Sequence, residues 1–342
     1  MKVSASRSVR ALCCVVALAA AALAGCGEKP EQPSAASPQQ FDLALDFYVN
    51  PDHAGIYMAL AEGHFEEAGL DVRPRVPSDP SAPIQQVAAG RADLAISYEP
   101  EVVLARDEGL PVVAVAALVP HPLTSLISLP AAGIREAADL RGKTIATAGI
   151  AYQSAFLDEI LRRERIPRSD VEQIDVGLGL LPAVLSGRAD AMLGGFRNIE
   201  GVDLAERGRK PRVVPVDELG IPTYDELVLV ANEARVREDP EPIRLFIAAL
   251  ERGTREALRR PEAAARAVLR AGEGLDPKLT RAEVKATLPL LAPQRRRPYG
   301  WLNPREWERF AGFMADAGLA QRRWTAEELL TNELLPDAGR DD

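Results

Sequence analysis

Strand-like and helix-like segments alternate along this chain in two consecutive series. The first series comprises residues 43–48, 55–70, 71–76, 83–90, 92–97, 100–109 and 111–119. The second comprises residues 133–149, 154–166, 171–177, 180–187 and 189–195. Strands that alternate with helices imply parallel pairing through right-handed crossovers. The sequence therefore predicts an α/β fold, and two series predict two α/β lobes.

The tetrapeptide GRAD occurs once in each series, at residues 90–93 and 187–190. In both places a glycine follows a helix-like segment, where it would act as a left-handed cap, and an aspartate precedes a buried strand. We therefore interpret the repeat as a structural joint between a helix and a strand. Ligands of open α/β sheets lie beyond the carboxyl ends of the strands, so functional residues are expected after each strand.

Three strings with aromatic and polar side chains follow predicted strands. They are FYVNPDH at residues 47–53, YEP at 98–100 and FRNIE at 196–200. Aromatic faces can stack on a flat ring, while asparagine offers both donors and an acceptor. For either of the last two strings alone, a half-buried aromatic with a solvated acid is the simpler interpretation. Equivalent strings in both lobes favour a shared cleft. His53 has two possible roles, bonding a ligand or capping a helix start.

The region after Glu238 is dominated by helical periodicity, over residues 241–260, 261–272 and 303–319. Its Trp and Phe residues have the spacing of a packed face. The sequence offers no glycine-rich phosphate loop, no nucleophile elbow and no metal-ligand spacing around its histidines, so neither a catalytic residue nor a metal or cofactor site is predicted.

The N-terminal 26 residues have the pattern of an export signal. Basic residues at positions 2, 7 and 10 precede an apolar run from Ala11 to Leu23, which is too short for a spanning helix. The string LAGC ending at Cys26 resembles the lipobox of bacterial lipoproteins, in which the cysteine is lipidated. An ordinary cleaved signal is the alternative. Residues 27–40, rich in Pro, Ser, Gln and Ala, are expected to form a flexible tether.

Composition and charge further limit the possible partners and sites of this protein. No cysteine follows Cys26, so the domain needs no disulfide and offers no thiolate. The formal net charge is −9, and loss of the three basic residues of the leader lowers it to −12. A net acidic surface argues against nucleic acid or an anionic membrane surface as a partner. With 47% apolar residues, the chain can bury two cores.

Taken together, these strings resemble a type II solute-binding lipoprotein of an ABC importer, in the branch related to thiamine-pyrimidine synthase (the NMT1/SsuA-like family). The matching strings are residues 45–59, 76–123, 180–202 and 301–319. The resemblance implies a periplasmic-binding-protein type II fold whose hinge has two crossovers, near Ser125 to Leu129 and near Asp225 to Val230. Lobe 1 would then comprise residues 41–125 and 230–335, and lobe 2 residues 126–229.

The resemblance to the synthases does not extend to their reactive groups. Ser97 stands where those enzymes carry the lysine that binds pyridoxal phosphate, and Glu101 where they carry a histidine. Their cysteine-rich motif falls on residues 221–225, which contain no cysteine. We therefore expect a binding protein and not an enzyme. A divergent pyrimidine synthase is the competing class.

The expected ligand is a small aromatic heterocycle, a thiamine pyrimidine precursor of the formylaminopyrimidine or hydroxymethylpyrimidine type, with riboflavin as the alternative. Stacking is assigned to Phe47 and Phe196, with Tyr98 or Tyr152; edge recognition to Asn50, Asn198 and Glu200; and support to His53 and Glu99, with Gly195 alongside. Arg197, where pyrimidine binders commonly have Trp, would either favour an anionic ligand group or lie on the surface. We expect an extracytoplasmic, lipid-anchored monomer that serves an ABC permease and its ATPase.

Overall fold

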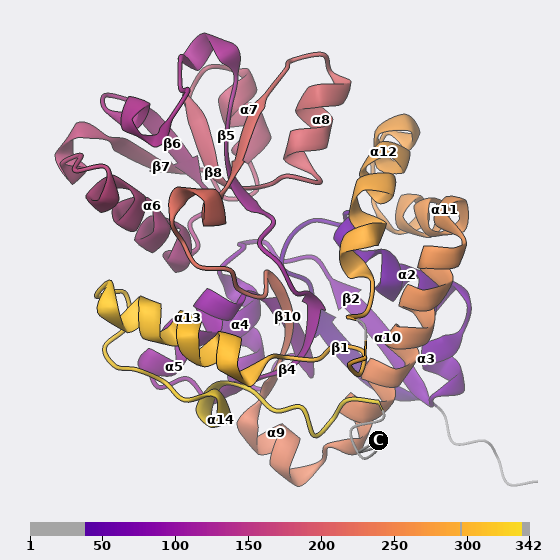
Figure 1. Cartoon of the computed structure of the whole chain (residues 1–342). Coiled ribbons are helices and arrows are strands. Elements are labelled where there is room, and N and C mark those ends of the chain that lie inside the picture. Colours follow the sequence, from indigo (N-terminus) through magenta and orange to yellow (C-terminus); the bar gives the residue numbers. More distant parts are fainter. Residues whose placement is uncertain (1–37, 295, 337–342) are drawn as a thin grey trace, which may run out of the picture. The chain divides into compact units, whose positions relative to one another are not determined.

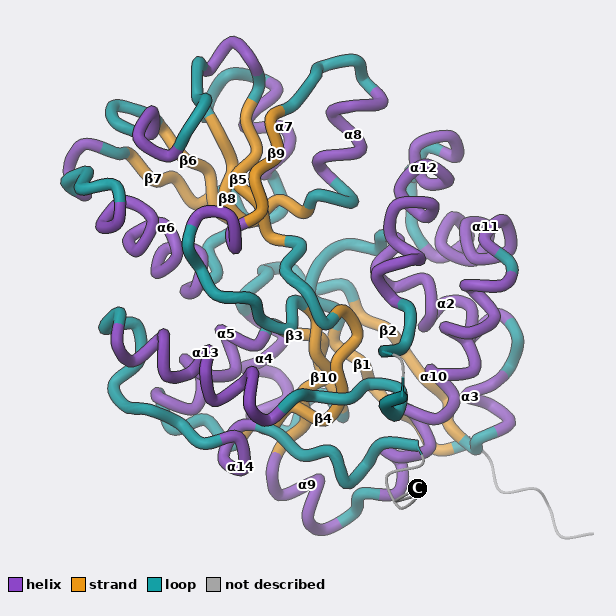
Figure 2. The backbone as a smooth tube through the Cα atoms, viewed as in Figure 1, coloured by secondary structure: helices purple, strands orange, loops and turns teal. Residues whose placement is uncertain are grey.

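The computed structural model describes residues 38–294 and 296–336, which build two five-stranded sheets with helices around each (Figure 1, Figure 2). The first sheet has the order β2-β1-β3-β10-β4 and the second the order β7-β6-β8-β5-β9. The strands of the first sheet are β1 (Gln39–Ala44), β2 (Leu70–Arg75), β3 (Leu94–Ser97), β4 (Val112–Val119) and β10 (Leu227–Asn232). Those of the second are β5 (Thr124–Ser128), β6 (Thr144–Thr147), β7 (Glu172–Asp175), β8 (Ala191–Phe196) and β9 (Arg212–Pro215).

Both sheets have the same pattern of strand pairing. In the first, β1 pairs in parallel with β2 and β3, and in the second, β6 pairs in parallel with β7 and β8. The strand next to each parallel trio, β10 or β5, runs antiparallel to both of its neighbours. The prediction of parallel pairing is therefore right for three strands of each sheet and wrong for the other two. The antiparallel strand is the one that enters its sheet from the other half of the molecule, against the direction of the trio.

The helices divide between the sheets. Those of the first half are α2 (Ala54–Ala61), α3 (His64–Glu67), α4 (Ala82–Ala88), α5 (Glu99–Asp107), α9 (Glu233–Glu238), α10 (Glu241–Arg259), α11 (Pro261–Ala271), α12 (Pro277–Thr287), α13 (Pro304–Asp316) and α14 (Ala326–Leu329), with 3-10 turns η1 (Pro51–His53) and η6 (Leu288–Leu291). Those of the second half are α6 (Ala151–Arg163), α7 (Leu180–Leu185) and α8 (Glu200–Glu206), with η2 (Pro130–Ala132), η3 (Ala137–Leu140), η4 (Arg168–Asp170) and η5 (Val216–Leu219).

The C-terminal helices return to the first sheet, as predicted. Helix α10 packs on α2 and α3, and α13 packs on α5, so the end of the chain covers elements from its beginning (Figure 1). Trp307 and Phe310 on α13 are fully buried, which confirms the packed face expected from their spacing. Within residues 38–294 and 296–336, no helix combines the length and apolar character needed to cross a membrane.

The chain passes between the sheets twice, through residues 120–123 and through residues 220–226. The predicted lobe boundaries fall a few residues later, inside β5 and β10. Both strands are buried from their first residues, Thr124 and Leu227, and belong to a sheet from that point. The two sheets lie in one compact unit that begins at Pro38, and the division into two lobes stays a prediction.

The two GRAD segments form the same joint in each sheet, which confirms the structural interpretation. Gly90 and Gly187 have φ of 67° and 75°, in the left-handed region that stops the preceding helix. Asp93 then accepts a hydrogen bond from the backbone nitrogen of Asp42 at 2.7 Å, and Asp190 accepts one from Thr144 at 2.9 Å. Each aspartate thus ties the strand that follows it to the backbone of its parallel neighbour, β1 or β6.

Other expectations need correction. The strand expected at residues 43–48 is β1, which begins at Gln39 and ends at Ala44, so it also takes the last two residues of the predicted tether. The helix expected at residues 55–70 is interrupted at Gly63, whose φ of 75° is incompatible with a continuing helix. Helix α12 was not predicted. The expected leader, Cys26 and residues 27–37 of the tether lie outside the described residues.

Candidate functional site

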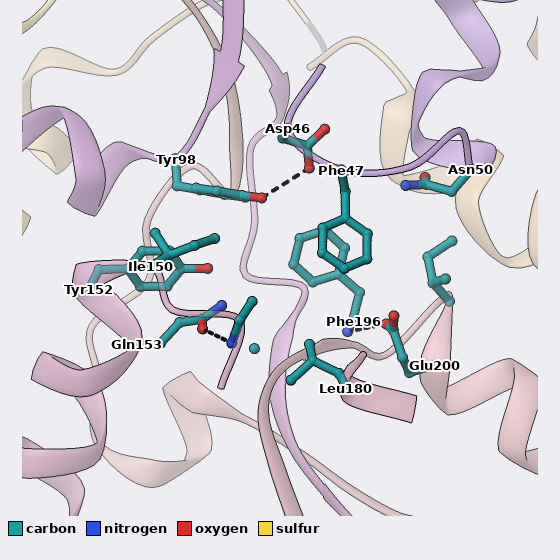
Figure 3. A pocket seen from close by; sticks show the side chains of 13 residues that line it. Asp46, Phe47, Asn50, Tyr98, Ile150, Tyr152, Gln153, Leu180, Phe196 and Glu200 are labelled. Carbon is teal, nitrogen blue, oxygen red and sulfur yellow. Dashed lines mark hydrogen bonds between the residues drawn. The ribbon is translucent and has the colours of Figure 1, made fainter. Parts of the chain in front are cut away.

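A pocket with about 370 Å³ of empty space, partly open to solvent, lies at the carboxyl ends of strands from both sheets (Figure 3). Its lining comes from the loop after β1, from Tyr98 after β3, from the β6–α6 connection and the start of α6, from α7, and from β8 through to the start of α8. The lining residues are Asp46, Phe47, Asn50, Tyr98, Ala148, Ile150, Tyr152, Gln153, Leu180, Gly194, Phe196, Ile199 and Glu200. The pocket therefore occupies the place that open α/β sheets provide for ligands.

Four aromatic rings line this pocket, and all four were predicted as stacking residues: Phe47, Tyr98, Tyr152 and Phe196. The ring centroid of Tyr98 lies 5.3 Å from that of Tyr152 and 6.5 Å from that of Phe196. Tyr98, Tyr152 and Phe196 are buried, while Phe47 is half-buried. Rings from both sheets thus face a common space, where they offer flat apolar surfaces to a ligand ring.

Asp46 is a lining residue that the sequence analysis missed, and it organises the first-sheet side of the pocket. One carboxylate oxygen lies 2.8 Å from Nε2 of His53, and the other accepts a hydrogen bond from the Tyr98 hydroxyl at 3.0 Å. The other ring nitrogen of His53 accepts from the backbone nitrogen of Asn50 at 3.4 Å, which fits a neutral ring protonated on Nε2. His53 therefore fixes Asp46 and the turn at Asn50 from behind the pocket, which is the supporting role.

Glu200 and Asn50 bring polar groups to the opposite side of the pocket from Tyr152 (Figure 3). Glu200 accepts a hydrogen bond from the backbone nitrogen of Phe196 at 2.7 Å and a long one from the Tyr48 hydroxyl at 3.4 Å. Burial raises the pKa of Glu200. Asn50 caps the turn η1 through its side-chain oxygen and donates to the carbonyl of Tyr48 at 3.1 Å.

Gln153 and Gly194 form a close contact at the floor of the pocket. The Gln153 side-chain oxygen accepts from the backbone nitrogen of Ala148 at 2.7 Å (Figure 3), so the amide nitrogen lies beside Gly194. A Cβ on Gly194 would lie 2.3 Å from that nitrogen, and the φ of Gly194 is 116°. Glycine is required here both by the backbone and by the close approach of the amide.

Four predicted site residues lie outside the lining. His53 is behind Asp46, as described, and Gly195 faces Met192 and Ile127 on the other side of β8 from Gly194. Glu99 is buried and accepts a hydrogen bond from the backbone nitrogen of Asp225 at 2.7 Å, so it anchors the second passage between the sheets. Asn198 is bonded to residues of the first half.

Sequence reasoning missed Asp46, Ala148, Ile150, Gln153, Leu180, Gly194 and Ile199. Asp46 was assigned to the interior of a strand that ends two residues earlier, at Ala44. The residues from 148 to 153 follow β6 directly, and the rule that ligands lie beyond carboxyl ends of strands would have found them. Leu180 and Ile199 carry no such signal, because isolated aliphatic residues are usually core.

The ionisable side chains of the lining other than tyrosine are two carboxylates, those of Asp46 and Glu200. Arg197, considered from the sequence as a possible partner for an anionic ligand group, does not line the pocket. Among residues 38–294 and 296–336, no group of three or more His, Cys, Asp or Glu side chains is placed to hold a metal ion. The pocket is thus aromatic and carboxylate-bearing, without a basic side chain.

Solved structures with the same fold include solute-binding proteins and the desulfurization enzyme DSZB. The alkanesulfonate-binding protein SsuA from Xanthomonas axonopodis pv. citri, bound to MOPS, superposes with a TM-score of 0.69 over 87% of this chain and all of its own, at 16% identity. The fold expected from the sequence, the type II periplasmic-binding-protein fold with two α/β sheets joined by two crossovers, is therefore confirmed.

Residues 50–264 match the family described as NMT1/THI5 like. A Haemophilus influenzae protein whose name refers to thiamine biosynthesis is 35% identical over 291 residues, which is 85% of this chain and 91% of that protein. The formylaminopyrimidine-binding protein of Halalkalibacterium halodurans is 34% identical over 78% of this chain and 82% of its own length. The 4-amino-5-hydroxymethyl-2-methylpyrimidine phosphate synthase of Aspergillus parasiticus is 28% identical over 67% and 69%. The chain belongs to the NMT1/THI5-like family.

Proposed function

We propose that this protein is the solute-binding component of an ABC importer and that it captures an amino-substituted pyrimidine, a thiamine precursor of the formylaminopyrimidine or hydroxymethylpyrimidine type. The similarity to the formylaminopyrimidine-binding protein, over most of both chains, supports this class of ligand. The predicted leader and Cys26 support capture outside the cytoplasmic membrane by a lipid-anchored protein.

The observation that carries the proposal is the composition of the pocket lining. Four aromatic rings suit a flat heterocycle, and the carboxylates of Asp46 and Glu200 suit a ligand with N–H donors, such as an exocyclic amino group. The ring nitrogens of a pyrimidine are acceptors, and the amide nitrogens of Gln153 and Asn50 can donate to them.

The same lining argues against a phosphorylated ligand. A phosphate ester carries close to two negative charges and is usually bound by arginine, lysine or a series of backbone amides. In this pocket it would lie near the carboxylates of Asp46 and Glu200, with no basic lining residue to offset the repulsion. The ligand that we propose is therefore the free pyrimidine and not its phosphate.

Affinity would arise mainly from the exclusion of water when the two halves close on the ring. Rings from both sheets contribute to the lining, so a bound ligand contacts both halves at once. A closed, ligand-filled form would be the species that the permease recognises.

The competing enzyme hypothesis requires groups that lie elsewhere. Ser97 and Glu101, which stand at the positions of the synthase lysine and histidine, are both buried, and Ser97 donates a hydrogen bond to Glu101. Neither residue lines the pocket. The two groups thus satisfy each other in the core, which favours binding over synthase chemistry.

Mass spectrometry of small molecules released from protein purified from its host tests the proposal. We expect a compound with the mass of an amino-substituted pyrimidine. If riboflavin were released instead, the proposed ligand would be a flavin and not a pyrimidine, and the proposed role in transport would stand. Absorbance of bound pyridoxal phosphate or iron in the purified protein would instead support the synthase.

A further inference from the structure

Asn198 joins the two halves of the molecule at a point just outside the pocket lining. It lies between β8 and α8, on the second sheet's half, and its side-chain nitrogen donates two hydrogen bonds to the first half. One goes to a carboxylate oxygen of Asp52 in η1 at 2.7 Å, and the other to the hydroxyl of Thr287 at the end of α12 at 2.8 Å. Both N–H groups of the amide are therefore used between the halves.

The three side chains are withdrawn from water. Asn198 is 3% exposed, Asp52 4% and Thr287 0%. None of them lines the pocket, although Glu200, two residues beyond Asn198, does so. The contact is thus next to the binding site but does not reach its interior.

The surroundings show that this contact belongs to a larger interface between α8 and α12, which face each other in Figure 1. At the outer edge of that interface, Lys278 on α12 forms an exposed ion pair with Glu206 on α8 at 3.0 Å. Such an exposed pair contributes little, because solvent screens it. The buried bonds of Asn198 are the stronger connection, because they are withdrawn from solvent and loss of either would leave a buried polar group without a partner.

These bonds can form only when the two halves are together. If the halves separate, Asn198, Asp52 and Thr287 become solvated. The two bonds therefore favour the closed arrangement, offset by the burial there of Asn198 Oδ1 and Asp52 Oδ2, which have no hydrogen-bond partner among the described residues. A residue that acts in this way changes the closing equilibrium and not the complementarity between pocket and ligand.

We propose that Asn198, through Asp52 and Thr287, is a latch that holds the halves closed and sets the residence time of the ligand without touching it. The choice of ligand in this inference rests on the proposed function, whereas the contact between the halves does not. It changes the role of Asn198 from the edge-reading contact expected from the sequence to a positioning residue.

The charges around the latch provide a sharp test. Asp52 lies near the acidic groups Asp46, Glu200 and Glu226, and Glu283 on α12 lies near Asp203, Glu200 and Asp52. Burial raises the pKa of Asp52 and of Glu283. Asp203 is paired with Arg207, which directly follows its helix. An Asn198→Asp change would place one more carboxyl group in this acidic interface, so closure would require an additional proton.

Stopped-flow measurement of dissociation, with formylaminopyrimidine as the probe, tests the latch. In Asn198→Ala, we expect dissociation about 10- to 100-fold faster than in the wild-type protein, with little change in association. The same factor should apply to hydroxymethylpyrimidine, since a latch acts alike on every ligand. In Asn198→Asp, the rate relative to wild type should be highest at pH 8 and should decline toward pH 5.

Asn232→Ala is the matched control, because the amide of Asn232 bonds only within the first half, to the carbonyl of Ala88 and the backbone nitrogen of Ala234. This variant should lose stability but keep the wild-type dissociation rate.

Small-angle scattering of the ligand-free proteins gives a readout that does not depend on the ligand: Asn198→Ala should have a larger radius of gyration than wild type and Asn232→Ala. The latch would be overturned if Asn198→Ala kept the wild-type dissociation rate. If neither pyrimidine binds, an unchanged radius of gyration in Asn198→Ala would overturn it. Failure of the wild-type protein to bind either pyrimidine would contradict the proposed function instead.

Discussion

The carboxylate of Glu226 accepts hydrogen bonds from both the backbone nitrogen and the hydroxyl of Thr124, at 2.7 and 2.8 Å. Glu226 ends the second passage between the sheets, and Thr124 directly follows the first. The backbone nitrogen of Leu123 and the hydroxyl of Tyr224 also donate to this carboxylate, at 2.6 and 3.0 Å. A single buried acid therefore ties the two passages together beside the pocket.

Replacement of Glu226 by Ala should lower the free energy of unfolding by about 2 to 4 kcal/mol, because two buried backbone amides and two hydroxyls lose their acceptor. Urea denaturation measures this change. Glu226→Gln keeps one acceptor oxygen and should cost less. A loss below about 0.5 kcal/mol in Glu226→Ala, the size of an ordinary surface substitution, would show that water replaces the carboxylate without cost.

Replacement of Gly194 by Ala should damage the pocket as well as the backbone. The new Cβ would meet the amide nitrogen of Gln153 at 2.3 Å, in a residue whose φ is 116°. Gly187→Ala is the control, since φ there is also positive, at 75°, but no atom lies within 4 Å of the new Cβ. We expect Gly187→Ala to cost about 1 kcal/mol of stability and to leave binding unchanged. Gly194→Ala should lower stability by more than Gly187→Ala does, and it should also weaken ligand binding. If the two variants had the same effect on thermal unfolding and on the affinity measured by calorimetry, this account would be contradicted.

Glu200→Ala should weaken binding of the pyrimidine by about 1 to 3 kcal/mol, because a charge-assisted hydrogen bond to the ligand is lost. Isothermal titration calorimetry measures the difference. Glu273→Ala, which removes an exposed carboxylate beyond the pocket, is the control. Unchanged affinity in the Glu200 variant would remove this residue from the site.

Stability should fall as the pH rises through the neutral range. Burial raises the pKa of Glu101 to about 8, well above the value of an unfolded glutamate. The folded state then binds more protons than the unfolded state between these two values, so its stability is greatest at acidic pH and declines toward pH 8. The Tm should therefore be higher at pH 5 than at pH 8.

Glu101→Gln, which keeps an acceptor for Ser97, should reduce this pH dependence. Glu328→Gln is the control, because the guanidinium of Arg322 lowers the pKa of Glu328 to about 2, below the range tested. If Glu101→Gln shows the wild-type decline in Tm, Glu101 does not titrate in this range.

The sequence predicted the α/β fold and the edge of the sheets where the pocket lies, because both depend on local patterns. The two aspartates of GRAD and the helices at residues 241–260 and 303–319 are examples. Helix α12 was missed although it begins with a recognisable signal, an Asp276 cap followed by Pro277 at the first helical position.

What the local pattern could not provide was the partner of each polar side chain. Asn50 and Asn198 have the same chemistry and both follow strands, yet Asn50 lines the pocket and Asn198 bonds across to Asp52. The difference arises because the halves meet in a particular orientation, which long-range packing decides. The same reason explains why Gly194 lines the pocket and Gly195 does not. Neighbouring residues of β8 point to opposite sides of the strand, and packing decides which side lies toward the pocket.

Calorimetric titration of the purified protein with three compounds tests the central claim most directly: formylaminopyrimidine, the phosphate ester of hydroxymethylpyrimidine, and riboflavin. We expect the first to bind tightly, and the phosphate ester to bind at least about 100-fold more weakly, because it must approach two buried carboxylates without a basic partner. Tighter binding of the phosphate ester or of riboflavin than of formylaminopyrimidine would contradict the assignment of the pocket to a free aminopyrimidine.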